Sequence, residues 1–155
     1  MKEDKYAQAS HNLAKAADIA IDSFKKYPPK IWDEETLNHV LSCYSEWKDN
    51  SLNPEPKFRN LKSLKYKIEA VFTCFQEGNG DYVEEFWKEI KVQNLPFKRE
   101  NKLAKILKRK KINNIHELDF VIDVIVPYQQ EGLINAEEVI LLNKWIGEFE
   151  NRKKK

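Results

Sequence analysis

Apolar side chains recur at intervals of three and four residues along most of the chain, which is the spacing that places them on one face of an α-helix. Only four of the 155 residues are glycine, and lysine, glutamate and leucine are abundant, which favours helices over strands. The pattern predicts an all-α fold, an irregular or orthogonal bundle of six or seven helices. The expected helices cover residues 5–27, 33–48, 57–77, 81–94, 99–110, 114–127 and 135–150.

The stretch 72–90 joins two of these helices and looks like the centre of the core. Gly78 is expected to take the left-handed conformation that ends a helix. Asp81 then predicts an N-cap, with Glu84 at the capping-box position three residues later. Four large rings are expected to pack between the two helices: Phe72, Phe75, Phe86 and Trp87.

Capping and loop signals mark other helix ends. Asn114 and Asn135 predict N-caps, and each has a glutamate three residues later. The segment 49–56 predicts a loop. It is not a calcium loop, because its sixth position is Pro54 where glycine is needed and its twelfth is Asn60 where a glutamate is needed. The third helix is expected to turn Leu61 inward, and the sixth Ile122.

A chain of this length predicts a single domain over residues 1–155. The apolar connector Leu95-Pro96-Phe97 marks a subdivision near 95–97. The part behind it is expected not to be an independent domain, because it is short and its core is thin. Residues 151–155 predict a frayed basic tail.

The composition excludes several classes of protein. The apolar fraction is 41% and the charged fraction 34%, as in a folded chain with a charged surface. The longest aliphatic run, Val139–Leu142, is too short to cross a bilayer, so no membrane association is expected. No signal peptide is recognised, and Cys43 and Cys74 predict free thiols in a reducing compartment, which favours the cytoplasm. The sequence leaves open whether these two cysteines are close together.

The sequence offers no catalytic constellation. The histidines, His11, His39 and His116, lie on three different predicted helices, and none has a second histidine or a cysteine at metal-ligand spacing. No glycine-rich phosphate loop follows a strand. We therefore expect no enzyme activity, no metal and no organic cofactor.

Charge is segregated along the chain, although the formal net charge is only +2. Residues 98–111 hold eight basic side chains against one acid, and residues 57–67 hold five more basic side chains. This basic helix 98–111 suggests an alternative function, a nucleic-acid-binding regulator. The sequence disfavours it, because the following helix is acidic and the whole domain lacks a basic footprint.

Several segments carry a resemblance to a known kind of protein. They are Phe75-Gln-Glu-Gly with Phe86-Trp87, Arg99-Glu100-Asn101-Lys102-Leu103, the run from Ile106 to Ile112, the helix with Glu117 and Val121-Ile122-Asp123, and Phe149-Glu150. Together they resemble small, uncharacterised bacterial all-helical proteins of the polymorphic-toxin immunity type, over roughly residues 31–150. The resemblance implies a non-enzymatic protein that binds and neutralises a cognate toxin domain. It implies no fixed binding motif, so no residue role is carried over.

Two surfaces are candidates for binding such a partner. The acidic face of the fourth helix suits a basic nuclease cleft. Its residues are Asp81, Glu84, Glu85 and Glu89. For a toxin that is not a nuclease, the aromatic-flanked segment from Trp47 to Pro56 is the equal candidate, and a solvated helix face is the plain alternative for the acids.

Overall fold

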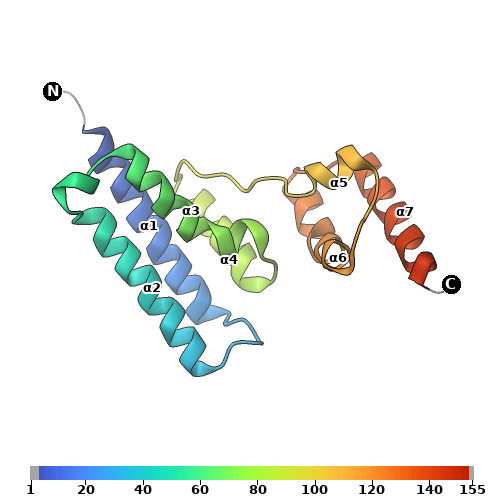
Figure 1. The fold of residues 1–155 in the computed structure, drawn as a ribbon, viewed down its shortest axis with the longest axis horizontal. Coiled ribbons are helices and arrows are strands. Elements are labelled where there is room, and N and C mark those ends of the chain that lie inside the picture. Colours follow the sequence, from blue (N-terminus) through green and yellow to red (C-terminus); the bar gives the residue numbers. More distant parts are fainter. Residues whose placement is uncertain (1–3, 154–155) are drawn as a thin grey trace. The chain divides into compact units, whose positions relative to one another are not determined.

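The computed structural model describes residues 4–153, and within that range the chain forms seven α-helices, one 3-10 turn and no strand. The all-α prediction is therefore confirmed. The elements are α1 (Lys5–Lys26), α2 (Glu34–Leu52), η1 (Pro56–Phe58), α3 (Leu61–Glu77), α4 (Asp81–Val92), α5 (Ala104–Arg109), α6 (Ile115–Gln130) and α7 (Ala136–Lys153) (Figure 1).

The chain divides into two compact units, of which unit 1 ends at Lys98 and unit 2 begins at Arg99. This boundary directly follows the 95–97 connector at which the sequence marks a subdivision. Each unit has an apolar core of its own. Whether unit 2 depends on unit 1 for folding stays a prediction.

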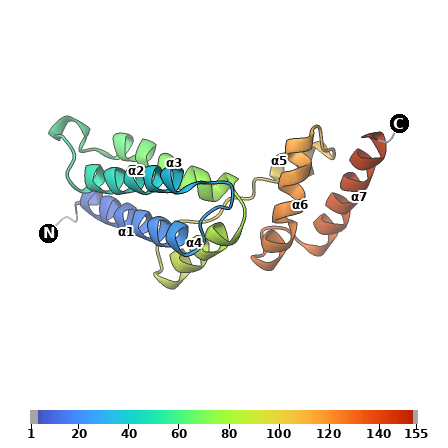
Figure 2. The same ribbon diagram turned by 90° about the horizontal axis from the view of Figure 1, so that it is seen from below.

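Unit 1 is built around α1, which packs against α2, α3 and α4. Helices α1 and α2 run side by side (Figures 1 and 2). Ala16, Ala17 and Ala20 are fully buried on α1, and their small side chains let neighbouring helices approach closely. Phe75 of α3 stacks on Phe86 of α4, with ring centroids 3.8 Å apart.

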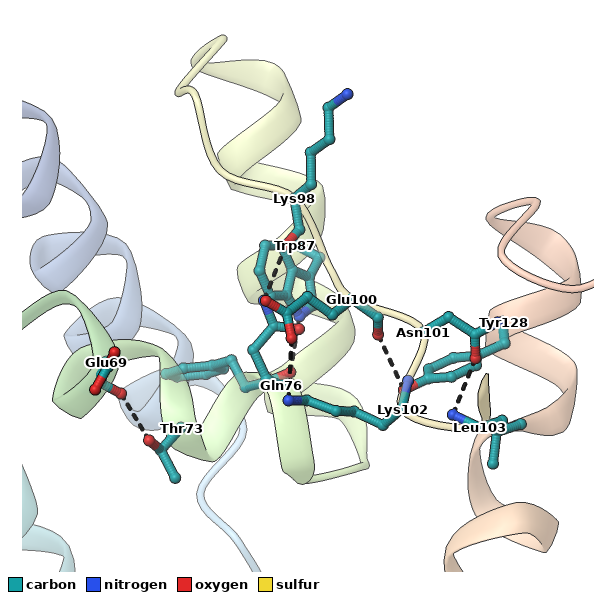
Figure 3. Close-up of polar contacts among 11 residues, drawn as sticks. Glu69, Thr73, Gln76, Trp87, Lys98, Glu100, Asn101, Lys102, Leu103 and Tyr128 are labelled. Atoms are coloured by element: carbon teal, nitrogen blue, oxygen red, sulfur yellow. Dashed lines mark hydrogen bonds and ion pairs between the residues drawn. The ribbon is translucent and has the colours of Figure 1, made fainter. Parts of the chain in front are cut away.

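Two buried polar side chains of this core donate to backbone carbonyls. The Tyr44 hydroxyl donates to the Val71 carbonyl at 2.9 Å, and Trp87 Nε1 donates to the Phe75 carbonyl at 2.9 Å. Gln76 Nε2 donates to the carbonyl of Lys98, also at 2.9 Å (Figure 3). The bonds of Tyr44 and Trp87 satisfy groups whose burial would otherwise be costly, whereas that of Gln76 is exposed.

The turn before α4 differs from the prediction. Gly80, with φ of 116°, is the N-cap, and Asp81 is the first helical residue with no side-chain capping bond. Gly78 is not left-handed, since its φ is −88°. Glycine is required there for space: a Cβ at Gly78 would lie 2.3 Å from the Cys74 carbonyl oxygen. The position of the turn was predicted correctly, but Gly80 is both the residue with positive φ and the N-cap, in place of Gly78 and Asp81.

Three helix boundaries also differ from expectation. Helix α2 continues to Leu52, so the first half of the predicted 49–56 loop is helical. The reason is tertiary, because Tyr6 of α1 donates to the Ser51 carbonyl at 2.9 Å. Helix α5 has six residues, shorter than the predicted 99–110. Helix α7 includes Asn151–Lys153 of the predicted frayed tail, where Arg152 donates to the Ile112 carbonyl at 3.0 Å; the last two residues lie outside the described range.

Unit 2 packs α6 against α7. Both predicted caps are found: Asn114 Oδ1 accepts from the Glu117 amide at 2.9 Å, and Asn135 and Glu138 each accept from the other's amide. Ile122 was predicted to point inward but is 46% exposed, as is Leu61 of unit 1 at 50%. Each position lies at the edge of its apolar stripe, where period alone does not decide burial.

Candidate functional site

The four predicted acids lie on α4 but do not act as one surface. Asp81 is exposed in the first turn, whereas Glu84, Glu85 and Glu89 are half-buried. Glu85 is already engaged, since Lys26 of α1 donates to its Oε1 at 3.2 Å. Of the four predicted acids, Glu85 is therefore used in a contact within unit 1, whereas Asp81 is exposed to solvent.

A small pocket lies between α1 and α4 on this face. Its volume is about 170 Å³. It is lined by Ile19, Asp22, Ser23 and Lys26 of α1, by Glu85 and Glu89 of α4, and by Gln93. The lining side chains of α1 are spaced three and four residues apart, and those of α4 four apart, so each helix presents a single face to the pocket. We call it the α1–α4 pocket.

Negative charge dominates the α1–α4 pocket. Asp22, Glu85 and Glu89 supply three carboxylates, and Lys26 supplies one ammonium group. The hydrogen bond to Glu85 raises the pKa of Lys26, and the nearby charges of Glu85, Tyr27 and Glu89 act in the same direction. Lys26 therefore stays charged and bound, while two acids remain in excess.

Ser23 is the second notable group of this pocket. Its side chain is 1% exposed, and its hydroxyl oxygen has no hydrogen-bond partner within the described part of the chain. A buried polar group without a partner costs about 1–3 kcal/mol. Ser23 is one of the lining residues of the α1–α4 pocket, but its hydroxyl oxygen has less than 1 Å² of accessible surface, so a group bound in the pocket does not reach it.

The structure thus selects among the predicted residues and adds others. Glu85 and Glu89 line the pocket, whereas Asp81 and Glu84 are not among its lining residues. Sequence reasoning missed Asp22, Ser23 and Lys26. The available signal was the spacing of four between Asp18, Asp22 and Lys26 on the polar side of α1, with a serine beside it.

Trp47, the other predicted binding residue, is half-buried and packs edge-on against Tyr44, with centroids 4.9 Å apart. It belongs to the margin of the core.

The segment after Trp47 lines a groove of about 540 Å³. The lining residues are Asn50, Asn53, Pro54, Glu55, Phe58, Ser63, Tyr66 and Lys67. Phe58 and Tyr66 are 47% and 65% exposed, so aromatic surface does reach solvent here.

Basic side chains gather at one end of unit 2. Lys110 and Lys111, which follow α5, line a pocket of about 470 Å³ together with Trp145, Glu148 and Arg152 of α7. Arg109 is not available there, because its guanidinium binds Glu117 at 2.7 Å. Within the predicted basic segment 98–111, Arg109 is therefore used in an ion pair within unit 2, whereas Lys110 and Lys111 line the pocket.

Metal-ligating side chains do not cluster within residues 4–153: no group of three or more His, Cys, Asp or Glu side chains there is placed to hold an ion. Cys43 and Cys74 are free thiols. Cys43 Sγ lies 3.7 Å from His39 Nε2, one helical turn away.

Among the described helices, none combines the length and apolar character needed to cross a membrane.

Comparisons with protein-family models, with curated proteins and with solved structures gave no match. Function is therefore inferred from the residues of this chain. Of its surfaces, the α1–α4 pocket has three carboxylates against one ammonium group, and two of those acids, Glu85 and Glu89, are among the predicted binding residues.

Proposed function

We propose that this chain is a non-enzymatic protein-binding module, an immunity protein that binds and neutralises a cognate bacterial toxin in the cytoplasm. The resemblance noted from the sequence supplies the class of partner. The observation that carries the proposal is the α1–α4 pocket, which has three carboxylates against one ammonium. Such a surface complements a basic partner surface.

Neutralisation by this route needs no chemistry from the chain itself. A toxin that cleaves nucleic acid must present cations where it holds phosphate. An acidic protein surface placed over those cations excludes the substrate and speeds association through long-range attraction. The pocket walls belong to helices that pack on a shared aromatic core, so little conformational entropy is lost on binding.

Affinity capture tests this function directly. The tagged protein is expected to retain one basic protein partner, identified by mass spectrometry, at low and high salt. Co-expression of that partner should arrest growth, and the full chain should restore it. The double variant Asp22→Asn, Glu89→Gln should lose rescue, whereas Glu46→Gln, which removes an exposed acid of α2, should rescue normally. A partner that is not toxic to cells would contradict the immunity role.

A second candidate, a nucleic-acid-binding regulator, is favoured by one observation: Arg152 joins Lys110 and Lys111 at the basic pocket of unit 2. This candidate predicts binding to DNA or RNA that falls steeply with salt. The variant Lys105→Glu, Lys111→Glu should abolish it. Arg109 is left unchanged in this test, because a glutamate there would face Glu117 and disturb the fold. Binding that ignores salt would exclude this candidate.

A further inference from the structure

We propose that unit 1 carries a binding site for single-stranded nucleic acid, in which a base stacks on Tyr66 and neighbouring lysines meet the phosphates. The site is the groove of about 540 Å³ that follows Trp47, here named the Tyr66 groove. It shares no lining residue with the α1–α4 pocket or with the basic pocket of unit 2, so the inference is independent of the proposed function. It accounts for the second basic segment of the sequence, residues 57–67.

Tyr66 offers an open aromatic face to the groove. It is 65% exposed, and no other ring packs on it within residues 4–153. Phe58, at 47% exposed, supplies a second ring to the same groove. Exposed aromatic side chains are the platforms on which the bases of a single strand stack, and such stacking accepts any base.

The size and the walls of the Tyr66 groove also suit a nucleotide. Its volume falls within the range of roughly 300–1,000 Å³ that pockets for whole organic ligands occupy. Asn50, Asn53 and Ser63 add side-chain donors and acceptors beside the rings. The edges of bases carry both kinds of group, whereas a lipid chain would leave these amides without partners. The walls therefore favour a base over a lipid.

Basic side chains surround the Tyr66 groove. Residues 56–67 contain five basic side chains and no acid. Lys67 lines the groove, and Lys62 precedes Tyr66 by one helical turn. Neither lysine forms an ion pair within residues 4–153, and Lys67 Nζ donates to the Asn50 carbonyl at 3.0 Å. Burial lowers the pKa of Lys67, as expected for a partly desolvated cation without a counter-charge.

One acid, Glu55, also lines the groove. It lies 3.7 Å from Lys57 Nζ, and the two side chains are 70% and 71% exposed, so water and the nearby cation screen its charge. The local balance is therefore Lys57, Lys62 and Lys67 against Glu55. This excess of positive charge attracts phosphate, and the attraction falls as salt is added.

A nuclear magnetic resonance titration of the full chain tests the proposal. The probe is a single strand of about eight thymidines, and the control is an abasic strand of the same length, which keeps the phosphates and lacks the bases. The thymidine strand is expected to give saturable backbone shifts within residues 50–67. The abasic strand should bind about tenfold more weakly, since it cannot stack. Equal affinity for the two strands would overturn the proposal.

Variants assign the effect to individual groups. Tyr66→Ala should weaken binding of the thymidine strand about tenfold, whereas Tyr66→Trp keeps a stacking face and should bind at least as well as the wild type. Lys62→Gln should reduce the slope of log affinity against log salt by about 0.7, the share of one phosphate contact. The control Lys15→Gln removes an exposed lysine of α1 and should change neither quantity. An unaltered spectrum outside residues 50–67 shows that each variant is folded. Full affinity in Tyr66→Ala would sink the assignment.

The basic pocket of unit 2 is a competing location for the strand. The variant Lys105→Glu, Lys111→Glu is expected to bind the thymidine strand as the wild type does. Loss of binding in that variant, with Tyr66→Ala unaffected, would place the strand on unit 2 and overturn the role given to the Tyr66 groove.

An anionic membrane is the other surface that lysines and exposed rings could meet. Sedimentation with vesicles of phosphatidylserine and phosphatidylcholine measures this directly, and no binding that depends on Tyr66 is expected. Vesicle binding that is lost in Tyr66→Ala, in a protein that gives no shifts with the thymidine strand, would overturn the proposal.

Discussion

Unit 1 and unit 2 stabilise their helices by different means. Unit 1 buries large rings from four helices, and Phe24 of α1 contacts rings of α2, α3 and α4. The core of unit 2 is mostly aliphatic, and the rings of Phe120 and Tyr128 make a looser contact, with centroids 6.4 Å apart. Side-chain N-caps occur in both units, at Asp4, Asp33 and Asn60 in unit 1 and at Asn114 and Asn135 in unit 2, so in unit 2 they stand beside a less aromatic core.

The polar contacts of unit 2 lie at the ends of its helices. Asn114 caps α6, and Glu117 binds Arg109 and the amide of Asn113. Asn101 Oδ1 accepts from the Leu103 amide at 2.9 Å just before α5 (Figure 3). A short unit cannot bury enough apolar surface to dominate its stability, so caps and ion pairs take a larger share. The comparison implies that mutations should act through packing in unit 1 and through helix ends in unit 2.

Separating the units should have the largest effect. The fragment 1–98 is expected to unfold cooperatively, whereas the fragment 99–155 alone should not. A chain of roughly 60 residues buries only about 60% of its unfolded surface, which leaves it marginal. Circular dichroism during urea unfolding measures both fragments. A cooperative transition in 99–155 would show that unit 2 is a domain in its own right.

Removing a ring from the core of unit 1 should have the next largest effect. Phe75 is fully buried and stacked on Phe86, so Phe75→Ala should lower the free energy of unfolding by about 3–5 kcal/mol. Denaturant unfolding of the full chain gives the value. Phe58→Ala removes the same ring at a position 47% exposed and should cost far less. Similar losses for the two variants would contradict a packing-dominated unit 1.

Removing a cap of unit 2 should have a moderate effect. Asn135→Ala deletes the oxygen that accepts from the Glu138 amide at 2.8 Å, and it should cost about 1 kcal/mol. Hydrogen exchange of α7 amides locates the loss. The matched control is Asn143→Ala, an exposed position within α7, where alanine has the higher helix propensity and no cost is expected. An equal change in the free energy of unfolding for the two variants would show that the Asn135 cap does not stabilise unit 2.

The smallest predicted effect depends on pH. Burial tends to raise the pKa of Glu117, but the hydrogen bonds from Arg109 and the Asn113 amide and the charge of Arg109 outweigh it, so the folded pKa is lowered. Glu117 therefore stabilises unit 2 above the ordinary glutamate pKa of about 4 and loses this contribution as the pH falls through its lowered folded value.

Thermal unfolding across this acidic range measures the effect against Glu117→Gln, which cannot titrate. The wild-type protein should lose more of its stability on acidification than the variant does. Parallel curves for the two proteins would show that the Arg109–Glu117 pair contributes no measurable stability, which is the case for many exposed ion pairs.

Local patterns predicted the helices of both units, because a sustained period of three and four specifies an amphipathic helix without knowledge of its neighbours. Caps were predictable for the same reason, and the reciprocal bonds of Asn135 and Glu138 confirm one capping box fully. The error at Asp81 has a local cause as well. Gly80 takes a positive φ there and becomes the N-cap, which shifts Asp81 by one position into the helix.

The candidate site could be predicted only in half. Glu85 and Glu89 share one face of α4 and were predicted from the excess of acids along that helix. Asp22, Ser23 and Lys26 come from α1, nearly sixty residues earlier, as the Lys26–Glu85 bond spans 59 positions. Helix pairing of this kind is set by the packing of the whole core, and no local pattern specifies which polar residues then meet.

The placement of the four tryptophans has an optical consequence. Trp32, Trp47 and Trp87 belong to unit 1, and Trp145 is the sole tryptophan of the sequence after Arg99. Trp145 is 6% exposed, in the apolar core of unit 2. In Trp145→Phe, the remaining indole fluorescence reports unit 1 alone. Subtracting that emission from the wild-type signal isolates the contribution of unit 2. The unfolding of both units can therefore be followed by intrinsic fluorescence, without an added dye.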